Sequence, residues 1–298
     1  MKATGEIMGI GSTLEESLLK GIRSLETGVY HLYHQKFDSY TADELWAYIN
    51  EFRDDNIYAI AELLRRGESV EKIHDVTKIT AYFIEAIQNI VTMEKALKEN
   101  AFDIEMLKNA KKMGFSDRYV AKLWNCRERE VFDLRRDNKV YPSFRMVDTC
   151  HTGAYIPYFY SSYTGSNASI VTEKKKIVVL GAGPIRIGQG VEFDYSTVHA
   201  VQTIKNSGYE AIIINNNPET VSTDYTTADK LYFEPLVTED VMNIIELEKP
   251  IGVIASLGGQ TAINLAEPLS KLGVKIIGTD CEAIDKADRK STRLNSSH

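Results

Sequence analysis

The sequence predicts an α-helical domain followed by an α/β domain with a doubly wound parallel sheet. All seven prolines occur at or after Pro142, so no proline interrupts the first half of the chain. The first half also contains two helix starts, Ser12 with Glu15 and Thr41 with Glu44, which match the pattern of capping boxes. After residue 175, short β-branched runs alternate with amphipathic stretches, which is typical of βαβ units.

The length and composition are those of an ordinary globular protein with about two domains. The chain has 298 residues, of which 43% are hydrophobic and 26% are charged. A formal net charge of −7 argues against broad electrostatic binding to nucleic acid or to an anionic membrane. The chain does not open on an apolar leader and contains no run of about 18 apolar residues. We therefore expect a cytoplasmic protein that binds neither nucleic acid nor membrane.

The helical domain is expected to contain about six to eight helices between residues 12 and 150. Gly114 is expected to end one helix, and Ser116 with Asp117 to begin the next. After Thr77, apolar residues follow helical spacing for about five turns. We find no catalytic group of residues in this domain and interpret it as a scaffold. The expected buried face of the long helix consists of Ile79, Phe83, Ala86, Ile87, Ile90, Met93 and Leu97.

The cysteine and histidine residues do not indicate a metal site. Cys126, Cys150 and Cys281 are far apart and include no CxxC pair, so neither a disulfide framework nor a zinc site is expected. His31 and His34 are three residues apart on an expected helix and could form a metal pair, but no third ligand is near them in sequence. Surface or aromatic-packed histidines are the simpler interpretation. Aromatic residues at helical spacing surround them and indicate core packing: Tyr30, Tyr33, Phe37 and Tyr40.

The second half of the chain is expected to form the sheet. An aromatic linker rich in Ser and Gly, residues 151–174, leads into an α/β domain over residues 175–289. Continuous β-branched runs suit strands covered on both faces, which predicts a parallel sheet of about five strands. The expected strands are residues 177–180, 211–214, 231–233, 252–255 and 275–277. The expected helices are residues 197–206, 239–248 and 261–272.

The first expected strand leads into a glycine-rich loop, residues 181–190. Such a loop presents backbone N–H groups to a phosphate or another anion, so a dinucleotide site is one hypothesis. The spacing does not fit GxGxxG, because Gly188 comes five residues after Gly183. Residues 215–217 are asparagines, where a ribose-binding acid is expected. A dinucleotide-dependent oxidoreductase is therefore the least favoured function.

The other residues expected at this edge of the sheet suit a small oxyanion. Arg186 provides a cation in the loop, and Glu192 and Asp194 follow within a few residues. Glu219 follows the second expected strand and Gln260 follows the fourth, so parallel strands would bring these loops to one edge. Arg186, Glu219 and Gln260 are thus a possible anion or substrate loop. The alternative is that the glycines only permit tight turns between strands and helices.

Four segments of the second half belong to one recognisable pattern. They are KIVVLGAGPIRIGQGVEFDY (176–195), NNNPETVSTDY (215–225), LYFEP (231–235) and GGQT (258–261). Together they resemble the large subunit of carbamoyl phosphate synthetases, at the Rossmann-like, pre-ATP-grasp domain that opens its second synthetic half. Three further segments resemble the end of an ATP-grasp domain and the two edges of the helical oligomerisation domain, namely MKATGEIMGI (1–10), RSLETG (23–28) and MVDTC (146–150).

This resemblance implies a division of the chain into five segments. They would be the tail of a truncated ATP-grasp domain (1–11), the oligomerisation domain (12–150), a linker (151–174), the pre-ATP-grasp domain (175–289) and a tail that matches no part of the family and is interpreted as non-native (290–298). The chain is thus expected to be a fragment that lacks both ATP-grasp active sites. In isolation it is expected to be inactive and to hold no cofactor.

The resemblance also implies a function. The family forms carbamoyl phosphate from bicarbonate and glutamine-derived ammonia, for arginine and pyrimidine synthesis. The full-length subunit would use ATP with Mg²⁺ or Mn²⁺, and a glutaminase small subunit would be its partner. Gly190 and Glu192 match positions that line the tunnel for carbamate, whereas no catalytic residue is assigned in this chain. Self-association through the helical domain is expected, and a non-catalytic oligomerisation or interaction module remains the alternative function.

Overall fold

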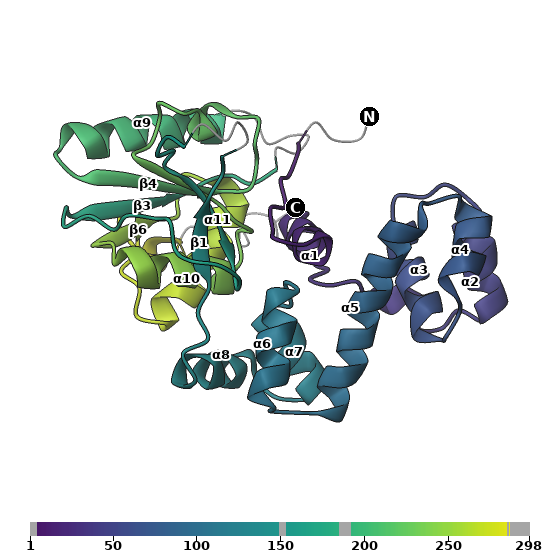
Figure 1. Cartoon of the computed structure of the whole chain (residues 1–298). Coiled ribbons are helices and arrows are strands. Elements are labelled where there is room, and N and C mark those ends of the chain that lie inside the picture. The colour runs from purple at the N-terminus through teal and green to yellow at the C-terminus, as the bar shows by residue number, and fades with distance from the viewer. Residues whose placement is uncertain (1–4, 149–152, 185–191, 285, 287–298) are drawn as a thin grey trace. The chain divides into compact units, whose positions relative to one another are not determined.

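The computed structural model describes residues 5–148, 153–184, 192–284 and 286, and these form two compact units. The helical unit comprises Gly11–Pro142 with Ser162–Thr164. The α/β unit comprises the described parts of Met1–Ile10, Ser143–Ser161 and Gly165–His298. Figure 1 shows the elements of both units. The structure therefore confirms the predicted fold class, in which an α-helical domain precedes an α/β domain with a mostly parallel sheet.

The number of α-helices in the helical unit agrees with the predicted six to eight. Eight α-helices lie within residues 14–137, together with one 3₁₀ helix, Gln35–Phe37. Gly114 follows the sixth of them with a φ of +88°, and Ser116 caps the seventh, as predicted. The α-helices are α1 (Leu14–Ser24), α2 (Ala42–Ile49), α3 (Asn56–Arg65), α4 (Val70–Thr77), α5 (Ala81–Glu99), α6 (Ile104–Lys112), α7 (Asp117–Trp124) and α8 (Glu128–Asp137).

One of the two predicted capping boxes is confirmed, whereas the box predicted at Ser12 and Glu15 is wrong. Thr41 and Glu44 form the expected box at the start of α2. At α1, however, the cap is Thr13, whose hydroxyl accepts from the Glu16 N–H. The carboxylate of Glu16 accepts in turn from the Ser12 N–H at 2.6 Å. Glu16 is buried, so its carboxylate needs hydrogen-bond donors, and it takes the Ser12 N–H rather than that of the cap residue Thr13.

The long helix α5 buries a face that differs in part from the prediction. Ile87, Ile90 and Leu97 are buried as expected. Ile79 precedes the helix and Phe83 lies on its outer side, and their side chains remain 37% and 50% exposed. The face begins instead at Ile84 and includes the buried carboxylate of Glu94. Because Glu94 is charged, a search for apolar residues at helical spacing does not include it in the buried face.

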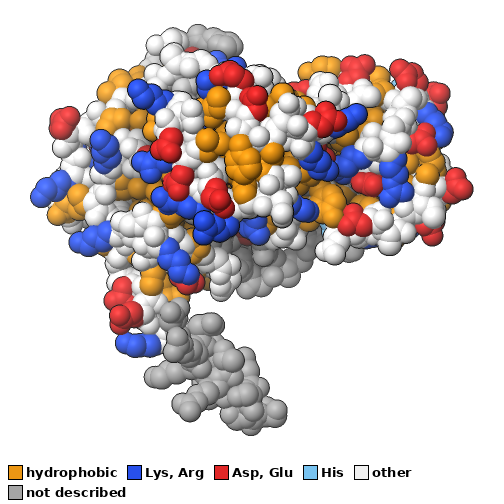
Figure 2. Space-filling view, turned by 90° about the horizontal axis from the view of Figure 1, so that it is seen from below, with side chains coloured by type: hydrophobic (Ala, Val, Ile, Leu, Met, Phe, Trp, Pro, Cys, Tyr) orange, Lys and Arg blue, Asp and Glu red, His pale blue; other side chains and the backbone are white. Residues whose placement is uncertain are grey.

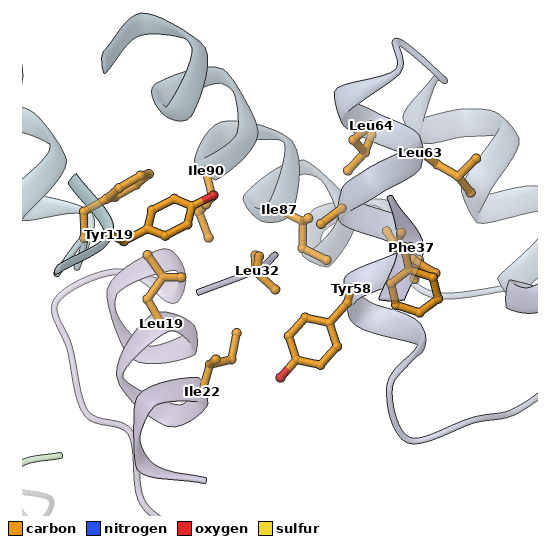
Figure 3. Packing of buried hydrophobic residues seen from close by; sticks show 14 of the residues in the cluster. Leu19, Ile22, Leu32, Phe37, Tyr58, Leu63, Leu64, Ile87, Ile90 and Tyr119 are labelled. Atoms are coloured by element: carbon orange, nitrogen blue, oxygen red, sulfur yellow. The ribbon is translucent and has the colours of Figure 1, made fainter. Parts of the chain in front are cut away.

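The aromatic residues near His31 pack into the core without forming the helix that their spacing predicts. Residues 29–34 are irregular, and only the short 3₁₀ helix follows them. Phe37 is nevertheless buried and packs edge-on against Tyr40 and Tyr48, with ring centroids 5.5 and 5.1 Å away. Figure 3 shows Phe37 and Leu32 among the buried side chains of the helices. The core interpretation is confirmed, whereas the helix is wrong.

The α/β unit contains a six-stranded sheet in the order β1-β2-β5-β4-β3-β6. The pairs β2–β5, β5–β4, β4–β3 and β3–β6 are parallel. Val201 and Ile204 of α9 (Glu192–Asn206) pack on one face of the sheet. Residues of α10 (Thr238–Glu248) and α11 (Gly259–Lys271) pack on the opposite face (Figure 1). The elements are β1 (Ser143–Met146), β2 (Tyr158–Ser162), β3 (Lys176–Leu180), α9 (Glu192–Asn206), β4 (Glu210–Asn215), β5 (Lys230–Phe233), α10 (Thr238–Glu248), β6 (Gly252–Ile254) and α11 (Gly259–Lys271).

Four of the five predicted strands are confirmed, and β1 and β2 were missed. The predicted strand at residues 275–277 is only a single bridge between Ile276 and Val253. The expected linker instead contains β2, whose Tyr158 pairs with Leu231 of β5. The polar serines of β2 resemble a loop in sequence, but pairing with β5 makes this segment a strand.

The unit boundaries differ from the segment boundaries expected at residues 11, 150 and 174. The helical unit ends at Pro142, because residues 143–161 join the sheet. The N-terminal segment also belongs to the α/β unit, since Met8 donates its N–H to the carbonyl of Asn216 at 2.8 Å and Ile10 packs on the sheet. The assignment of residues 1–11 to an ATP-grasp domain stays a prediction, and residues 290–298 lie outside the described residues.

Candidate functional site

The carboxyl edge of three neighbouring strands forms the candidate site of the α/β unit. From β3 the chain crosses to β4 on one side, whereas β6 pairs with β3 on the other side. The order of the strands thus reverses next to β3, and ligands of open α/β sheets bind at such a point. The loops that follow β3, β4 and β6 converge here, as the sequence predicts.

Asn215, at the end of β4, ties the loop after β3 to the loop after β4. It is buried, and its Oδ1 accepts from the N–H of Gly183 at 3.1 Å and from the N–H of Asn216 at 2.9 Å. Its Nδ2 donates to the hydroxyl of Ser222 at 3.4 Å. The carboxamide is therefore committed to positioning backbone. This residue stands where a dinucleotide site would place its ribose-binding acid.

Two glycines of this edge are explained by close packing alone. A Cβ atom on Gly258 would lie 2.3 Å from the carbonyl oxygen of Gly181, which is closer than real atoms approach. A Cβ atom on Gly181 would lie 2.5 Å from Cγ of Asn215. At these positions the structure favours the alternative interpretation that glycine permits tight packing between the loops.

The start of α9 is joined to the loop after β4 through Asp194. This side chain is buried, and its Oδ2 accepts from the N–H of Ser222 at 3.0 Å. Glu192 is the first residue of α9 and is exposed. The dipole of a helix favours negatively charged side chains at this end.

Glu219 and Gln260, two of the other predicted site residues, lie in the loops and helix start at the carboxyl edge. Glu219 is exposed, and its N–H donates to Oδ1 of Asn217 at 3.0 Å. Gln260 lies in the first turn of α11, and its Nε2 donates to Oδ1 of Asn264 at 2.6 Å. Glu192, Glu219 and Gln260 thus share the carboxyl edge. Arg186 and Gly190 lie outside the described residues.

The sequence interpretation missed a buried charge cluster in the helical unit. Nε2 of His31 lies 2.9 Å from Oε1 of Glu94, and Arg65 donates to both oxygens of that carboxylate at 2.7 Å. Burial opposes ionisation of Glu94, but the hydrogen bonds from Arg65 and His31 outweigh it and lower its pKa to about 2. Burial lowers the pKa of His31 to about 4, although Glu94 favours its charged form.

The two histidines that could form a metal pair make separate contacts within the helical unit. His31 stacks on Tyr119 with 3.7 Å between ring centroids, which confirms the aromatic-packed interpretation for this residue. Nδ1 of His34 accepts from the N–H of Lys36 at 3.1 Å. Within the part of the chain that the structure describes, no group of three His, Cys, Asp or Glu residues is arranged to hold a metal ion.

The surface shows no segregation of charge on the face displayed in Figure 2, where cationic and anionic side chains are interspersed with hydrophobic ones. Among the described helices, none has both the length and the apolar composition required to span a membrane.

Two protein families match successive parts of the chain. Residues 6–139 match the family described as the carbamoyl-phosphate synthetase large chain, oligomerisation domain. Residues 173–286 match the family described as the carbamoyl phosphate synthase preATP-grasp domain. The first match covers the helices of the helical unit, and the second covers the sheet from β3 onward together with α9, α10 and α11. The chain therefore belongs to the family of carbamoyl phosphate synthetase large chains.

Proposed function

We propose that this chain supplies the oligomerisation and pre-ATP-grasp domains of an enzyme that forms carbamoyl phosphate from bicarbonate and glutamine-derived ammonia, for arginine and pyrimidine synthesis. The observation that carries the proposal is the succession of the two family matches along one chain. The fold of each unit supports it, because eight α-helices precede a mostly parallel sheet covered on both faces.

The role proposed for the α/β unit is to form part of the wall along which carbamate passes to the second phosphorylation. Gly190 and Glu192 are the residues proposed for this wall. The exposed position of Glu192 at the carboxyl edge supports its part in the proposal. Carbamate is polar and labile, and a carboxylate can accept hydrogen bonds from its N–H groups. Arg186, Glu219 and Gln260 are proposed as an anion loop at the same edge.

The two phosphorylations are proposed to occur outside these two domains. ATP with Mg²⁺ or Mn²⁺ would bind the ATP-grasp domains of a full-length subunit, and a glutaminase small subunit would supply ammonia. Asn215, which stands where a dinucleotide site would place its ribose-binding acid, is committed to backbone N–H groups. The isolated chain is accordingly proposed to be inactive.

A chimera tests this function directly. Residues 6–286 would replace the two matching domains of a complete carbamoyl phosphate synthetase large chain, and carbamoyl phosphate would be measured with glutamine and with ammonia. We expect synthesis with both nitrogen donors. The host large chain without replacement is the control. A chimera that folds and hydrolyses ATP at the normal rate but forms no carbamoyl phosphate would contradict the proposal.

A non-catalytic interaction module is the second candidate, and an exposed apolar face favours it. Near the junction of α4 and α5, the side chains of Val76, Ile79, Tyr82 and Phe83 are between 37% and 62% exposed. Apolar side chains that gather on a surface often mark a protein contact. This face belongs to the oligomerisation domain, so it supports a role in self-association.

A further inference from the structure

The helical unit contains a cavity that has no part in the proposed function. Its volume is about 610 Å³, which lies within the range of sites for small molecules. One wall is the segment before the 3₁₀ helix and the other is α7 with the turn that follows it. The side chains relevant to ligand chemistry are Tyr30, His31, Tyr33, Arg118, Tyr119 and Lys122.

Two cations of α7 border this cavity. Arg118 and Lys122 are one helical turn apart, so they lie on the same side of α7. The guanidinium of Arg118 lies 3.9 Å from the ring centroid of Tyr30, and Nζ of Lys122 lies 3.5 Å from that of Tyr33. Like charges at this spacing repel each other, and the tyrosine rings offset the repulsion through cation–π contacts.

Neither cation has a counter-ion in the described chain. No ion pair or hydrogen bond joins Arg118 or Lys122 to a described carboxylate. Of the described residues that line the cavity, Glu128 alone carries a carboxylate, and it has an interaction of its own. The cavity therefore combines two cations, which form no ion pair within the described chain, with one anion, and this favours an anionic ligand.

His31 adds an unsatisfied hydrogen-bond acceptor. Its side chain is buried, with 2% of the residue exposed, and Nε2 must donate to Glu94 because an ionised carboxylate only accepts. In the neutral ring Nδ1 is then an acceptor, and it is buried without a hydrogen-bond partner. His31 is one of the residues that line the cavity, whereas Glu94 is not. A buried acceptor without a partner is unfavourable until a donor reaches it.

We propose that this cavity binds a small organic anion that also carries a hydroxyl or amino donor. Arg118 and Lys122 hold the anionic group, a carboxylate or a phosphate ester, and the donor of the ligand gives a hydrogen bond to Nδ1 of His31. The rings of Tyr30 and Tyr33 keep the two cations in place before the ligand arrives. The site is independent of the carboxyl edge of the sheet and of the proposed carbamate tunnel.

Calorimetric titration of the whole chain with two matched pairs of probes tests the proposal. Malate and succinate differ by one hydroxyl, and so do glycerol 3-phosphate and propyl phosphate. We expect at least one hydroxylated probe to bind with a Kd below about 1 mM and at least about fivefold more tightly than its partner without the hydroxyl. The pair that shows this preference identifies the anionic group as carboxylate or phosphate. Absence of binding by all four probes, or equal binding within both pairs, would overturn the proposal.

Substitution of the exposed cations provides the second arm of the test. Arg118→Gln and Lys122→Gln remove one charge each without disturbing the core, and each is expected to weaken binding of the preferred probe by at least about fivefold. Lys112→Gln is the matched control, because Lys112 is an exposed cation of the same unit outside the cavity. Circular dichroism confirms that the variants fold. Equal weakening by Lys112→Gln, or unchanged binding in both cavity variants, would also overturn the proposal.

Discussion

Lys230 and Glu248 form a buried ion pair at the amino edge of the sheet, with 2.7 Å between Nζ and Oε1. Their side chains are 4% and 0% exposed. Lys176 approaches the other oxygen of Glu248 at 3.4 Å, and Glu210 lies 3.6 Å from Lys230. Two lysines and two glutamates therefore balance their charges where β3, β4 and β5 begin, at the edge opposite the candidate site.

Removal of one partner from this network is expected to destabilise the α/β unit strongly. Lys230→Met leaves Glu248 buried with less compensation, and we expect the free energy of unfolding to fall by about 3–5 kcal/mol. Urea unfolding measures the change. Lys205→Met is the control, since Lys205 is exposed and lies 3.9 Å from Asp229, and its loss is expected to cost less than about 1 kcal/mol. Similar small losses in the two variants would show that the buried network does not stabilise the sheet.

The buried His31 is expected to make stability depend on pH. Its pKa is about 4 in the folded chain against an ordinary value of 6.5, so between these values the unfolded chain binds more protons. Stability therefore falls as the pH falls, and we expect this residue to account for a loss of about 2 kcal/mol between about pH 7.5 and about pH 5. Urea unfolding at a series of pH values measures the slope.

His31→Gln supplies the comparison for that slope. The variant loses packing against Tyr119, so it is less stable at every pH, but it has no imidazole to titrate. Its free energy of unfolding should therefore vary less over the same pH interval. An identical slope in the two proteins would assign the pH dependence to other groups.

The isolated chain is expected to bind neither ATP nor NAD. Asn215 directs its carboxamide to backbone N–H groups, and the packing of Gly181 against Gly258 leaves no room for a side chain between their loops. These residues supply neither a ribose-binding acid nor the fingerprint spacing of a dinucleotide site. Calorimetric titration with each nucleotide measures binding, with a complete large chain as the positive control for ATP. Micromolar affinity for either nucleotide would contradict the proposal that nucleotides bind outside these two domains.

Glu192→Lys is expected to obstruct the carbamate tunnel in a full-length subunit. A long cation would replace the carboxylate at the start of α9, where the helix dipole disfavours positive charge. Bicarbonate-dependent ATP hydrolysis should survive, because it needs no transfer of carbamate between sites. Carbamoyl phosphate formation should fall by more than about tenfold, which corresponds to about 1.4 kcal/mol on the transfer step. Parallel assays measure whether carbamoyl phosphate formation falls while ATP hydrolysis is retained.

Glu173→Lys is the matched control for this substitution. Glu173 is an exposed carboxylate of the same unit and precedes β3, at the opposite edge from Glu192. Both activities should remain unchanged in this variant. If Glu192 is only a helix-start carboxylate, its replacement costs about 0.3–1 kcal/mol of stability and both activities decline together or not at all. That result would remove Glu192 from the tunnel.

Self-association is expected to use the apolar face near the start of α5. Tyr82→Glu and Phe83→Glu place charges on side chains that are 62% and 50% exposed, so they should weaken association without unfolding the unit. Sedimentation of the whole chain measures the oligomeric state. Phe52→Glu is the control, because Phe52 is a fully exposed aromatic residue of the same unit outside this face. A strict monomer at about millimolar concentration would exclude an oligomerisation role for this chain.

The sequence predicts those features that depend on local patterns. The β-branched runs of β3 and β4 and the box at Thr41 are readable because period and capping chemistry are local. The strand β2 cannot be predicted from local pattern, since it depends on the pairing of Tyr158 and Phe159 with the distant strand β5. The cap at Thr13 likewise depends on the burial of Glu16, which tertiary packing decides.

The same distinction applies to the candidate site. Parallel strands bring their loops to one edge, so the convergence of the loops after β3, β4 and β6 follows from topology. The partners of Asn215 and the approach of Gly258 to Gly181 depend on side-chain placement within these loops. The charge cluster around Glu94 joins α3, α5 and the segment at His31, and no local pattern in the sequence connects three such distant positions.

The hydrogen bond from Met8 to Asn216 has a consequence for how the chain folds during synthesis. It joins the N-terminal segment to Asn216, which follows both β4 and the helical unit in sequence, so the helical unit is an insertion within the α/β unit. Every residue of the helical unit has left the ribosome once Thr164 has emerged. The α/β unit cannot be completed until Asn216 and the strands that follow it have also emerged. The order of synthesis therefore favours completion of the inserted unit before that of the unit that contains it.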